Sequence, residues 1–215
     1  MDNTNDINSC LMLAVNLNTP VDLGCIFDAH DLKDTGIELD SHITLLYAQG
    51  KKLPKENLLD DIKNILKNDY QKLEDTCKTE NLFEVLDIFD LDYFENDSDY
   101  IILRLKQDFK LFNELSLINK ELKSKYNISS EFTQYRPHIT LAELVPGRAQ
   151  KYLESEKLRL VLEDSFVDFE DLMVSFGKSN AFNGLTMNAS ISSGRRLSKS
   201  LMVIGIFAKL LDWMR

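Results

Sequence analysis

The stretch 136–144, RPHITLAEL, repeats a tetrapeptide that already occurs within 41–47, SHITLLY. The chain has three histidines. Two of them, His42 and His138, open the HITL copies and lie 138 − 42 = 96 residues apart. Each copy alternates with period two, so a histidine and the threonine two residues later share one face of a strand. The repeat therefore predicts two strands, which present His42 with Thr44 and His138 with Thr140.

Parity along the first copy decides which side chains reach the face that carries the histidine. His42, Thr44 and Leu46 are expected on one face of the strand, and Ile43, Leu45 and Tyr47 on the other. Tyr47 is therefore predicted to face away from His42, in the core.

The first half of the chain alternates short apolar runs with polar connections. We expect a buried strand over Cys10–Leu17, a polar loop over Asp28–Asp40 and a helix over Leu53–Lys67. The helix shows apolar residues at helical spacing and carries Pro54 near its start. The predicted order of elements in this half is therefore a strand, the HITL strand and a helix.

The second half has a similar content. We expect strands over Leu82–Phe94, Tyr100–Lys106, Leu158–Leu162, Phe166–Phe176 and Leu185–Ile191, and helices over Phe109–Tyr126 and Ala149–Lys157. Each half thus contains strands, a helix and one HITL strand. The pattern predicts an α+β protein, built as a pseudo-symmetric pair of lobes with one sheet from each.

Two segments differ in charge. Residues 195–215 hold five basic residues and one acidic residue, a net of +4, so residues 1–194 carry −10 − 4 = −14. We expect 1–194 to form the domain and 195–215 a basic amphipathic helix or tail. The tail is too short and too interrupted to span a membrane. It either packs on its own acidic body or docks on a membrane surface or a protein partner.

The net charge of −10 argues against binding of long nucleic acid, which is held by many Lys and Arg contacts to phosphates. A small nucleotide or short oligonucleotide in a local pocket remains compatible with it. The three cysteines form no CxxC pair, and no secretory signal is visible, which favours a reducing, cytoplasmic location. His30 is the only spare histidine, so no metal site is expected. Oligomeric state is not indicated.

The paired motif suits acid–base chemistry. Histidine is the side chain whose unperturbed pKa lies near neutral pH. Two imidazoles on facing strands can hold one base and one acid at once, and threonine hydroxyls can donate to non-bridging phosphate oxygens. The candidate catalytic residues are His42, Thr44, His138 and Thr140. This chemistry requires neither a metal nor a cofactor.

Paired His-x-Thr motifs at this separation, in the contexts HITLLY and RPHITLAE, resemble those of the two-histidine (2H) phosphoesterase superfamily. The resemblance covers most of residues 10–192, but neither the tail nor the acidic connection around 87–99. It implies a bilobal fold in which two antiparallel sheets line a cleft, with helices outside. It also implies that the two histidines form the acid–base pair and that the two threonines bind the phosphate.

The superfamily includes RNA 2′,3′-cyclic phosphodiesterases and ligase-like enzymes, phosphodiesterases that cleave 2′,5′-oligoadenylates, and phage anti-CBASS enzymes that destroy cyclic-oligonucleotide signals. The leading hypothesis is a metal-independent phosphodiesterase for a small cyclic or short oligonucleotide. One alternative is an RNA- or tRNA-end-processing enzyme, which requires a basic rim around the site. Another is a non-catalytic nucleotide-binding or assembly protein that docks through its tail.

Residues near the second motif are further candidates for substrate binding. Tyr135 and Phe132 can stack a nucleobase, and packing residues are an equal alternative for both. Arg136 can pair with a phosphate or with a surface carboxylate. His30 is expected at the solvated surface, and Lys51 either at the rim of the cleft or in a solvated turn.

Overall fold

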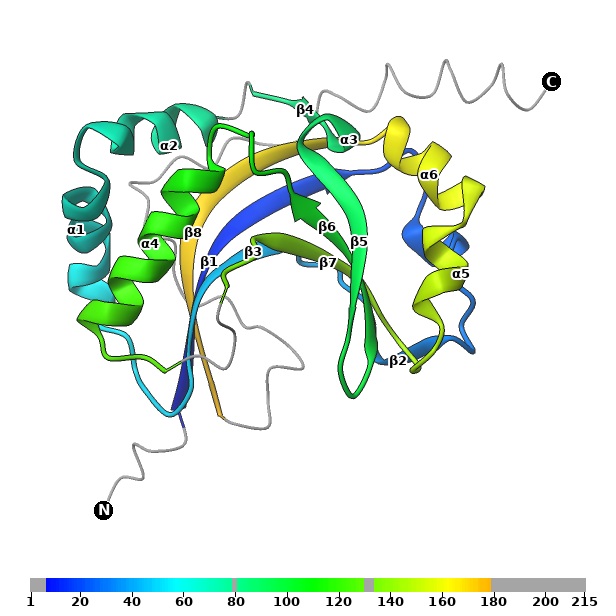
Figure 1. Ribbon diagram of the computed structural model, residues 1–215, viewed down its shortest axis with the longest axis horizontal. Coiled ribbons are helices and arrows are strands. Elements are labelled where there is room, and N and C mark those ends of the chain that lie inside the picture. Colours follow the sequence, from blue (N-terminus) through cyan, green and yellow to red (C-terminus); the bar gives the residue numbers. More distant parts are fainter. Residues whose placement is uncertain (1–6, 79–80, 130–133, 179–215) are drawn as a thin grey trace.

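The structure, a computed structural model, describes residues 7–78, 81–129 and 134–178 (Figure 1). The expected strand over 185–191, the tail 195–215 and Phe132 lie outside the described residues.

The described chain forms two four-stranded antiparallel sheets. Sheet A has the order β3-β1-β8-β4 and contains β1 (Ile7–Asn18), β3 (His42–Ala48), β4 (Phe83–Glu84) and β8 (Phe166–Lys178). Sheet B has the order β2-β7-β6-β5 and contains β2 (Leu32–Ile37), β5 (Phe89–Glu95), β6 (Asp99–Leu105) and β7 (His138–Leu144). The predicted α+β class is therefore correct, and each sheet holds one HITL strand.

Helices flank both sheets (Figure 1). The α-helices are α1 (Lys55–Leu66), α2 (Tyr70–Thr76), α3 (Val85–Ile88), α4 (Phe112–Lys125), α5 (Ala149–Leu153) and α6 (Glu156–Glu163), and short 3₁₀ turns span Leu23–Cys25 and Lys67–Asp69. α1 packs on α4, and α4 contacts β3 of sheet A. α5 contacts β5 and β6 of sheet B. Each HITL strand thus belongs to a sheet that is covered by helices.

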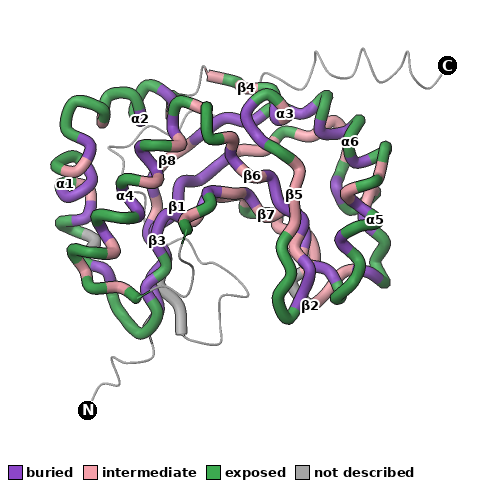
Figure 2. The backbone as a smooth tube through the Cα atoms, in the orientation of Figure 1, coloured by how far each residue is buried: buried purple, intermediate pink, exposed green. Residues whose placement is uncertain are grey.

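A continuous apolar core joins sheets and helices. The residues directly after each motif histidine, Ile43 and Ile139, are fully buried. Leu115, Ile118 and Leu122 of α4 are also fully buried, whereas Leu117 is exposed, so Ile118 and not Leu117 belongs to the buried face of this helix. In Figure 2 the strands carry most of the buried positions, and the outer faces of α1, α5 and α6 are exposed.

Three sequence-based expectations about single elements are wrong. The run 158–162 alternates like a strand, but it lies in α6, which begins after Ser155, whose hydroxyl accepts a hydrogen bond from the Leu158 N–H. The expected strand over 82–94 is broken into β4, α3 and β5. The expected loop over 28–40 contains β2, which pairs with β7. The structure therefore has more helix, and one more strand in sheet B, than the sequence predicted.

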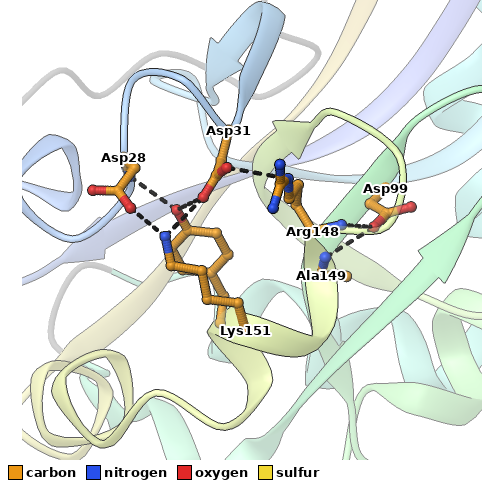
Figure 3. A network of polar contacts seen from close by, with 7 residues as sticks. Asp28, Asp31, Asp99, Arg148, Ala149 and Lys151 are labelled. Carbon is orange, nitrogen blue, oxygen red and sulfur yellow. Dashed lines mark hydrogen bonds and ion pairs between the residues drawn. The ribbon is translucent and has the colours of Figure 1, made fainter.

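A polar network fixes α5 to β6 of sheet B and to the connection that leads into β2 (Figure 3). The buried carboxylate of Asp31 accepts hydrogen bonds from Lys151 Nζ and Tyr152 Oη, both at 2.8 Å, and Arg148 Nε lies 3.3 Å from its other oxygen. Asp99, at the start of β6, accepts hydrogen bonds from the backbone N–H groups at the start of α5. The connection from β1 to β2 and the helix after β7 are thus locked together.

Candidate active site

The two HITL strands, β3 and β7, lie against one another although they belong to different sheets (Figure 1). The segment leading into each motif bonds to the other motif. Tyr135 Oη donates to the Thr44 carbonyl at 3.0 Å, and the Glu38 N–H donates to the Leu141 carbonyl at 3.0 Å. These reciprocal bonds fix the position of the first motif relative to the second.

Both histidine rings are oriented in the same way. Nδ1 of His42 lies 2.8 Å from the Asp40 carbonyl oxygen, and Nδ1 of His138 lies 2.7 Å from the Arg136 carbonyl oxygen. A carbonyl oxygen can only accept, so each Nδ1 carries the proton. In a neutral ring Nε2 is then the unprotonated nitrogen. Each histidine is therefore set to exchange protons through Nε2.

Strand register assigns the threonines to the same faces as the histidines. Across β1, His42 pairs with Ala14 and Thr44 with Met12. Across β6, His138 pairs with Arg104 and Thr140 with Ile102. All four motif side chains are half-buried, whereas the apolar residues between them are buried. We call the face of each sheet that carries its histidine the inner face.

Each motif strand contains a β-bulge at the leucine of HITL. Register shifts between Leu11 and Met12 opposite β3, and between Ile101 and Ile102 opposite β7, so Leu45 and Leu141 have no partner on the neighbouring strand. One extra residue reverses the parity of everything after it. The side chains five residues after each histidine therefore return to the inner face.

The bulge corrects the prediction for Tyr47. This residue pairs with Cys10, on the inner face, and its side chain is 43% exposed. Its predicted place in the core is wrong, and Leu46, fully buried, takes that place. Glu143 holds the equivalent position after the second bulge and pairs with Tyr100.

The inner face of sheet A has a thiol next to the first threonine. Cys10 Sγ donates a weak hydrogen bond to Thr44 Oγ1 at 3.9 Å. Burial raises the pKa of Cys10 to about 11, with the Thr44 bond acting in the opposite direction. The thiol is therefore protonated at neutral pH, and its one proton can be donated either to Thr44 Oγ1 or to the Leu11 carbonyl, which is also at 3.9 Å.

Sheet B adds three rows of side chains to its inner face. Pairing across β5, β6 and β7 gives Asp90–Arg104–His138, then Asp92–Ile102–Thr140, then Phe94–Tyr100–Glu143. Phe94 stacks on Tyr100 at 4.8 Å between ring centroids and meets the His138 ring edge to face at 5.3 Å. The acidic connection, which the family resemblance left out, thus contributes side chains beside the second histidine.

The electrostatic surroundings of His138 favour its neutral form. Burial lowers the pKa of His138, and the charge of His42 lowers it further, whereas the bond to the Arg136 carbonyl acts in the opposite direction. Nε2 of His138 is therefore unprotonated at neutral pH and can accept a proton.

The remaining candidates divide between packing and exposure. Tyr135 packs against the core, and burial raises its pKa, so its hydroxyl serves the bond to Thr44. Arg136 is exposed at a cavity described below. His30 is exposed, as expected. Lys51 Nζ donates to carbonyls at the end of α4, including that of Tyr126 at 3.1 Å, and so serves as a helix cap.

The sequence did not indicate that Phe94 and Arg104 are neighbours of His138, or that Tyr100 stacks on Phe94. The hairpin of β5 and β6 was expected, but its register against β7 is a long-range feature. The available signal was the spacing of Phe94 and Tyr100 around the polar turn, which makes them direct partners in a hairpin.

Among residues 7–78, 81–129 and 134–178, no cluster of three or more His, Cys, Asp or Glu side chains is arranged to hold a metal ion. In the same ranges, no helix has the length and apolar content needed to cross a membrane.

The fold and the site together define an α+β protein with two antiparallel sheets, in which paired HITL strands present two histidines and two threonines. Comparison of the sequence with models of known protein families gives no match, and comparison with curated proteins gives none either.

Proposed function

We propose that this protein is a phosphodiesterase of the two-histidine type, which cleaves a ribose phosphodiester by acid–base catalysis and needs no metal. The observation that carries the proposal is the matched geometry of the two motifs. Each histidine bonds through Nδ1 to the carbonyl two residues before it, each threonine follows on the same face, and each strand bulges at the same leucine. Any regular strand places the threonine on the face of the histidine, but accidental repeats of a tetrapeptide have no reason to share the Nδ1 contact and the bulge.

In the proposed mechanism His138 is the base and His42 the acid. Nε2 of His138 takes the proton of the attacking oxygen, either a neighbouring 2′-hydroxyl or a water molecule. The new P–O bond forms while the bond to the leaving oxygen breaks, and protonated His42 gives its proton to that oxygen. One proton is taken and one is given, and exchange with solvent restores both rings.

The threonines act on the charge of the phosphate. The hydroxyls of Thr44 and Thr140 donate to the non-bridging oxygens, which gain negative charge in the transition state. When the Cys10 thiol donates its proton to Thr44 Oγ1, the threonine oxygen is the acceptor, and the hydroxyl proton of Thr44 is left for the phosphate.

The proposed substrate is a small cyclic or short oligonucleotide. The chain carries a net charge of −10, which repels a long polyanion, whereas one or two phosphates need only local donors. RNA-end processing and binding without turnover are the outcomes that would replace this proposal.

The test compares wild type with His42→Asn and His138→Asn on cyclic di- and trinucleotides, 2′,5′-oligoadenylate and 2′,3′-cyclic nucleotides, with products identified by mass spectrometry. Loss of either acid–base group is expected to lower kcat by about 10²-fold or more. His30→Asn is the matched control, because this histidine is exposed in a turn, and it is expected to retain full activity.

Addition of EDTA is expected to leave turnover unchanged. Loss of activity with EDTA, or equal activity of wild type and both motif variants, would contradict the mechanism. Tight binding of a nucleotide without any product would assign the chain to the non-catalytic class.

A further inference from the structure

A cavity of about 240 Å³ opens beside the second histidine, where β6 ends and β7 begins. Its wall comes from the start of β5, the end of β6 and the segment leading into β7, and the first residue of α4 closes it. Most of its polar lining is basic or amide: Arg104, Lys106, Gln107, Gln134 and Arg136, with one carboxylate, Asp90.

The cavity adjoins the candidate active site through two residues. Arg104 is the register partner of His138 across β6 and β7, and directly paired residues have Cβ atoms about 5 Å apart. Arg136 lies two residues before His138, and its carbonyl accepts the bond from Nδ1 of that ring. Arg104 is therefore a direct neighbour of His138 in the sheet, and Arg136 connects the cavity to the segment that holds the His138 ring.

The lining is positively charged in an acidic protein. Among the described residues, three cationic ones and one with a carboxylate line the cavity, whereas the whole chain carries −10. Arg104 is held by Asp90 at 3.5 Å and Asp92 at 3.1 Å. A guanidinium has five N–H donors, so these two contacts leave donors for a further anion.

Within the part of the chain that the structure describes, no carboxylate forms an ion pair with Lys106 or Arg136. Lys106 Nζ donates to the carbonyls of Leu86 and Asp87, at 2.6 and 3.1 Å, which orients the ammonium group without cancelling its charge. Arg136 is exposed, and within the described residues its guanidinium makes no hydrogen bond or ion pair. It is positioned beside the active site with its donors available.

We propose that this cavity binds a second phosphate, one nucleotide away from the phosphate that is cleaved. The substrate is then an oligonucleotide, cyclic or linear, with at least two phosphates, and not a mononucleotide cyclic phosphate. This inference rests on the proposed function. The volume is below the 300–1,000 Å³ typical of sites that enclose a whole small molecule, so the cavity suits a phosphate with its sugar, while the rest of the ligand lies over the inner faces.

The experiment measures equilibrium binding by titration calorimetry at one ionic strength. The probes are adenine dinucleotides whose sugars lack the 2′-hydroxyl, so that no internal attack consumes them. One probe has only its internucleotide phosphate, and two others carry an additional 5′- or 3′-terminal phosphate. In the wild type, one of the two-phosphate probes is expected to bind about tenfold or more tightly than the one-phosphate probe.

Arg136→Gln is expected to abolish this gain and to leave the affinity for the one-phosphate probe within about twofold, because the first phosphate binds at the motif threonines. Arg159→Gln is the matched control. Arg159 is exposed on α6, pairs with Glu163 and does not line this cavity, so the gain is expected to persist.

An equal affinity of the wild type for all three probes, or the same loss of the gain in both variants, would overturn the inference, whatever the turnover assays show. A gain that depends on Arg136, in a protein that cleaves none of the panel, would support the cavity and contradict the proposed catalysis. The two proposals therefore fail on different measurements.

Discussion

Two carbonyl oxygens, those of Asp40 and Arg136, determine what the motif histidines can do. By holding Nδ1–H in each ring, they leave Nε2 as the site of proton exchange. The rings then differ in their surroundings. His138 meets the edge of Phe94 and is held neutral by burial and by the charge of His42. The same tetrapeptide thus places its histidine in different surroundings in the two copies, and those of the second copy favour the neutral imidazole.

The influence of His42 on His138 gives a prediction at this scale. A neighbouring positive charge disfavours protonation, so its removal in His42→Asn is expected to raise the pKa of His138. Titration of the ring protons by NMR in wild type and variant measures this shift. His30→Asn is the control, with no change in the titration of His138 expected. An unchanged or lower pKa of His138 in His42→Asn would show that the rings do not interact.

At the scale of the element, the bulges decide which side chains serve the site. Without a bulge, Leu46 would share the face of His42 and Tyr47 would lie in the core. With the bulge, Leu46 is fully buried and Tyr47 is 43% exposed. The bulge therefore adds one more side chain to the inner face of each motif strand, that of Tyr47 in β3 and that of Glu143 in β7.

A pair of alanine substitutions tests the bulge in β3. Leu46→Ala is expected to lower the free energy of unfolding by about 2–5 kcal/mol, as for other fully buried leucines. Tyr47→Ala is expected to lower it by about 1 kcal/mol or less, because the side chain is partly exposed. Urea-induced unfolding followed by circular dichroism gives both values. The reverse order, with Tyr47→Ala the more damaging, is what a regular strand without the bulge would produce.

Period-two alternation was enough to predict the two HITL strands, because each has one half-buried and one buried face. The bulge escaped prediction because a second apolar residue follows each inserted leucine, Leu46 after Leu45 and Ala142 after Leu141, so the apolar pattern does not show that a residue is inserted. The run 158–162 misled for a related reason. Leu160 completes a strand-like alternation, yet it is 52% exposed, and burial follows the helical spacing of Leu158, Val161 and Leu162.

Long-range pairing limited the prediction of the site. The motif histidines and threonines carry their own local signal, so the sequence predicted them as candidates. Phe94 and Arg104 approach His138 only because β5, β6 and β7 pair in one register. No local pattern in an acidic hairpin indicates that register. The side chains that surround the second histidine therefore became visible only in the assembled sheet.

At the scale of the whole molecule, β3 and β7 are in contact although they belong to different sheets, so the connections between the sheets determine how the two motifs lie. The chain crosses from β1 in sheet A to β2 in sheet B through a connection that contains Asp31, and the network of this residue fastens the connection to α5 (Figure 3). β2 then pairs with β7, and the Glu38 N–H bonds to the Leu141 carbonyl just before the chain enters the first motif. The network of Asp31 thus fixes one end of the connection that leads into the first motif.

Asp31 therefore gives a prediction about the stability of the whole protein. Hydrogen bonds from Lys151 and Tyr152 lower its pKa more than burial raises it, and the charges of Lys151 and Arg148 lower it further. A carboxyl group with a lowered folded-state pKa stabilises the protein above its unfolded-state pKa of about 3.9, and that contribution is lost as the pH falls through the folded value. At pH 7, Asp31→Asn is expected to lower the free energy of unfolding by about 1–3 kcal/mol.

The measurement is urea-induced unfolding of wild type and variants at neutral pH and at several values below pH 4. The difference between wild type and Asp31→Asn is expected to be constant above about pH 5 and to shrink in acid, where the wild-type carboxyl becomes protonated. Asp28→Asn is the matched control, because Asp28 pairs with the same Lys151 but its side chain is 65% exposed. An exposed pair contributes about 1 kcal/mol or less. A penalty for Asp28→Asn as large as that for Asp31→Asn, or a difference that persists unchanged in strong acid, would show that the ionised Asp31 carboxylate does not stabilise the attachment of the β1–β2 connection to α5.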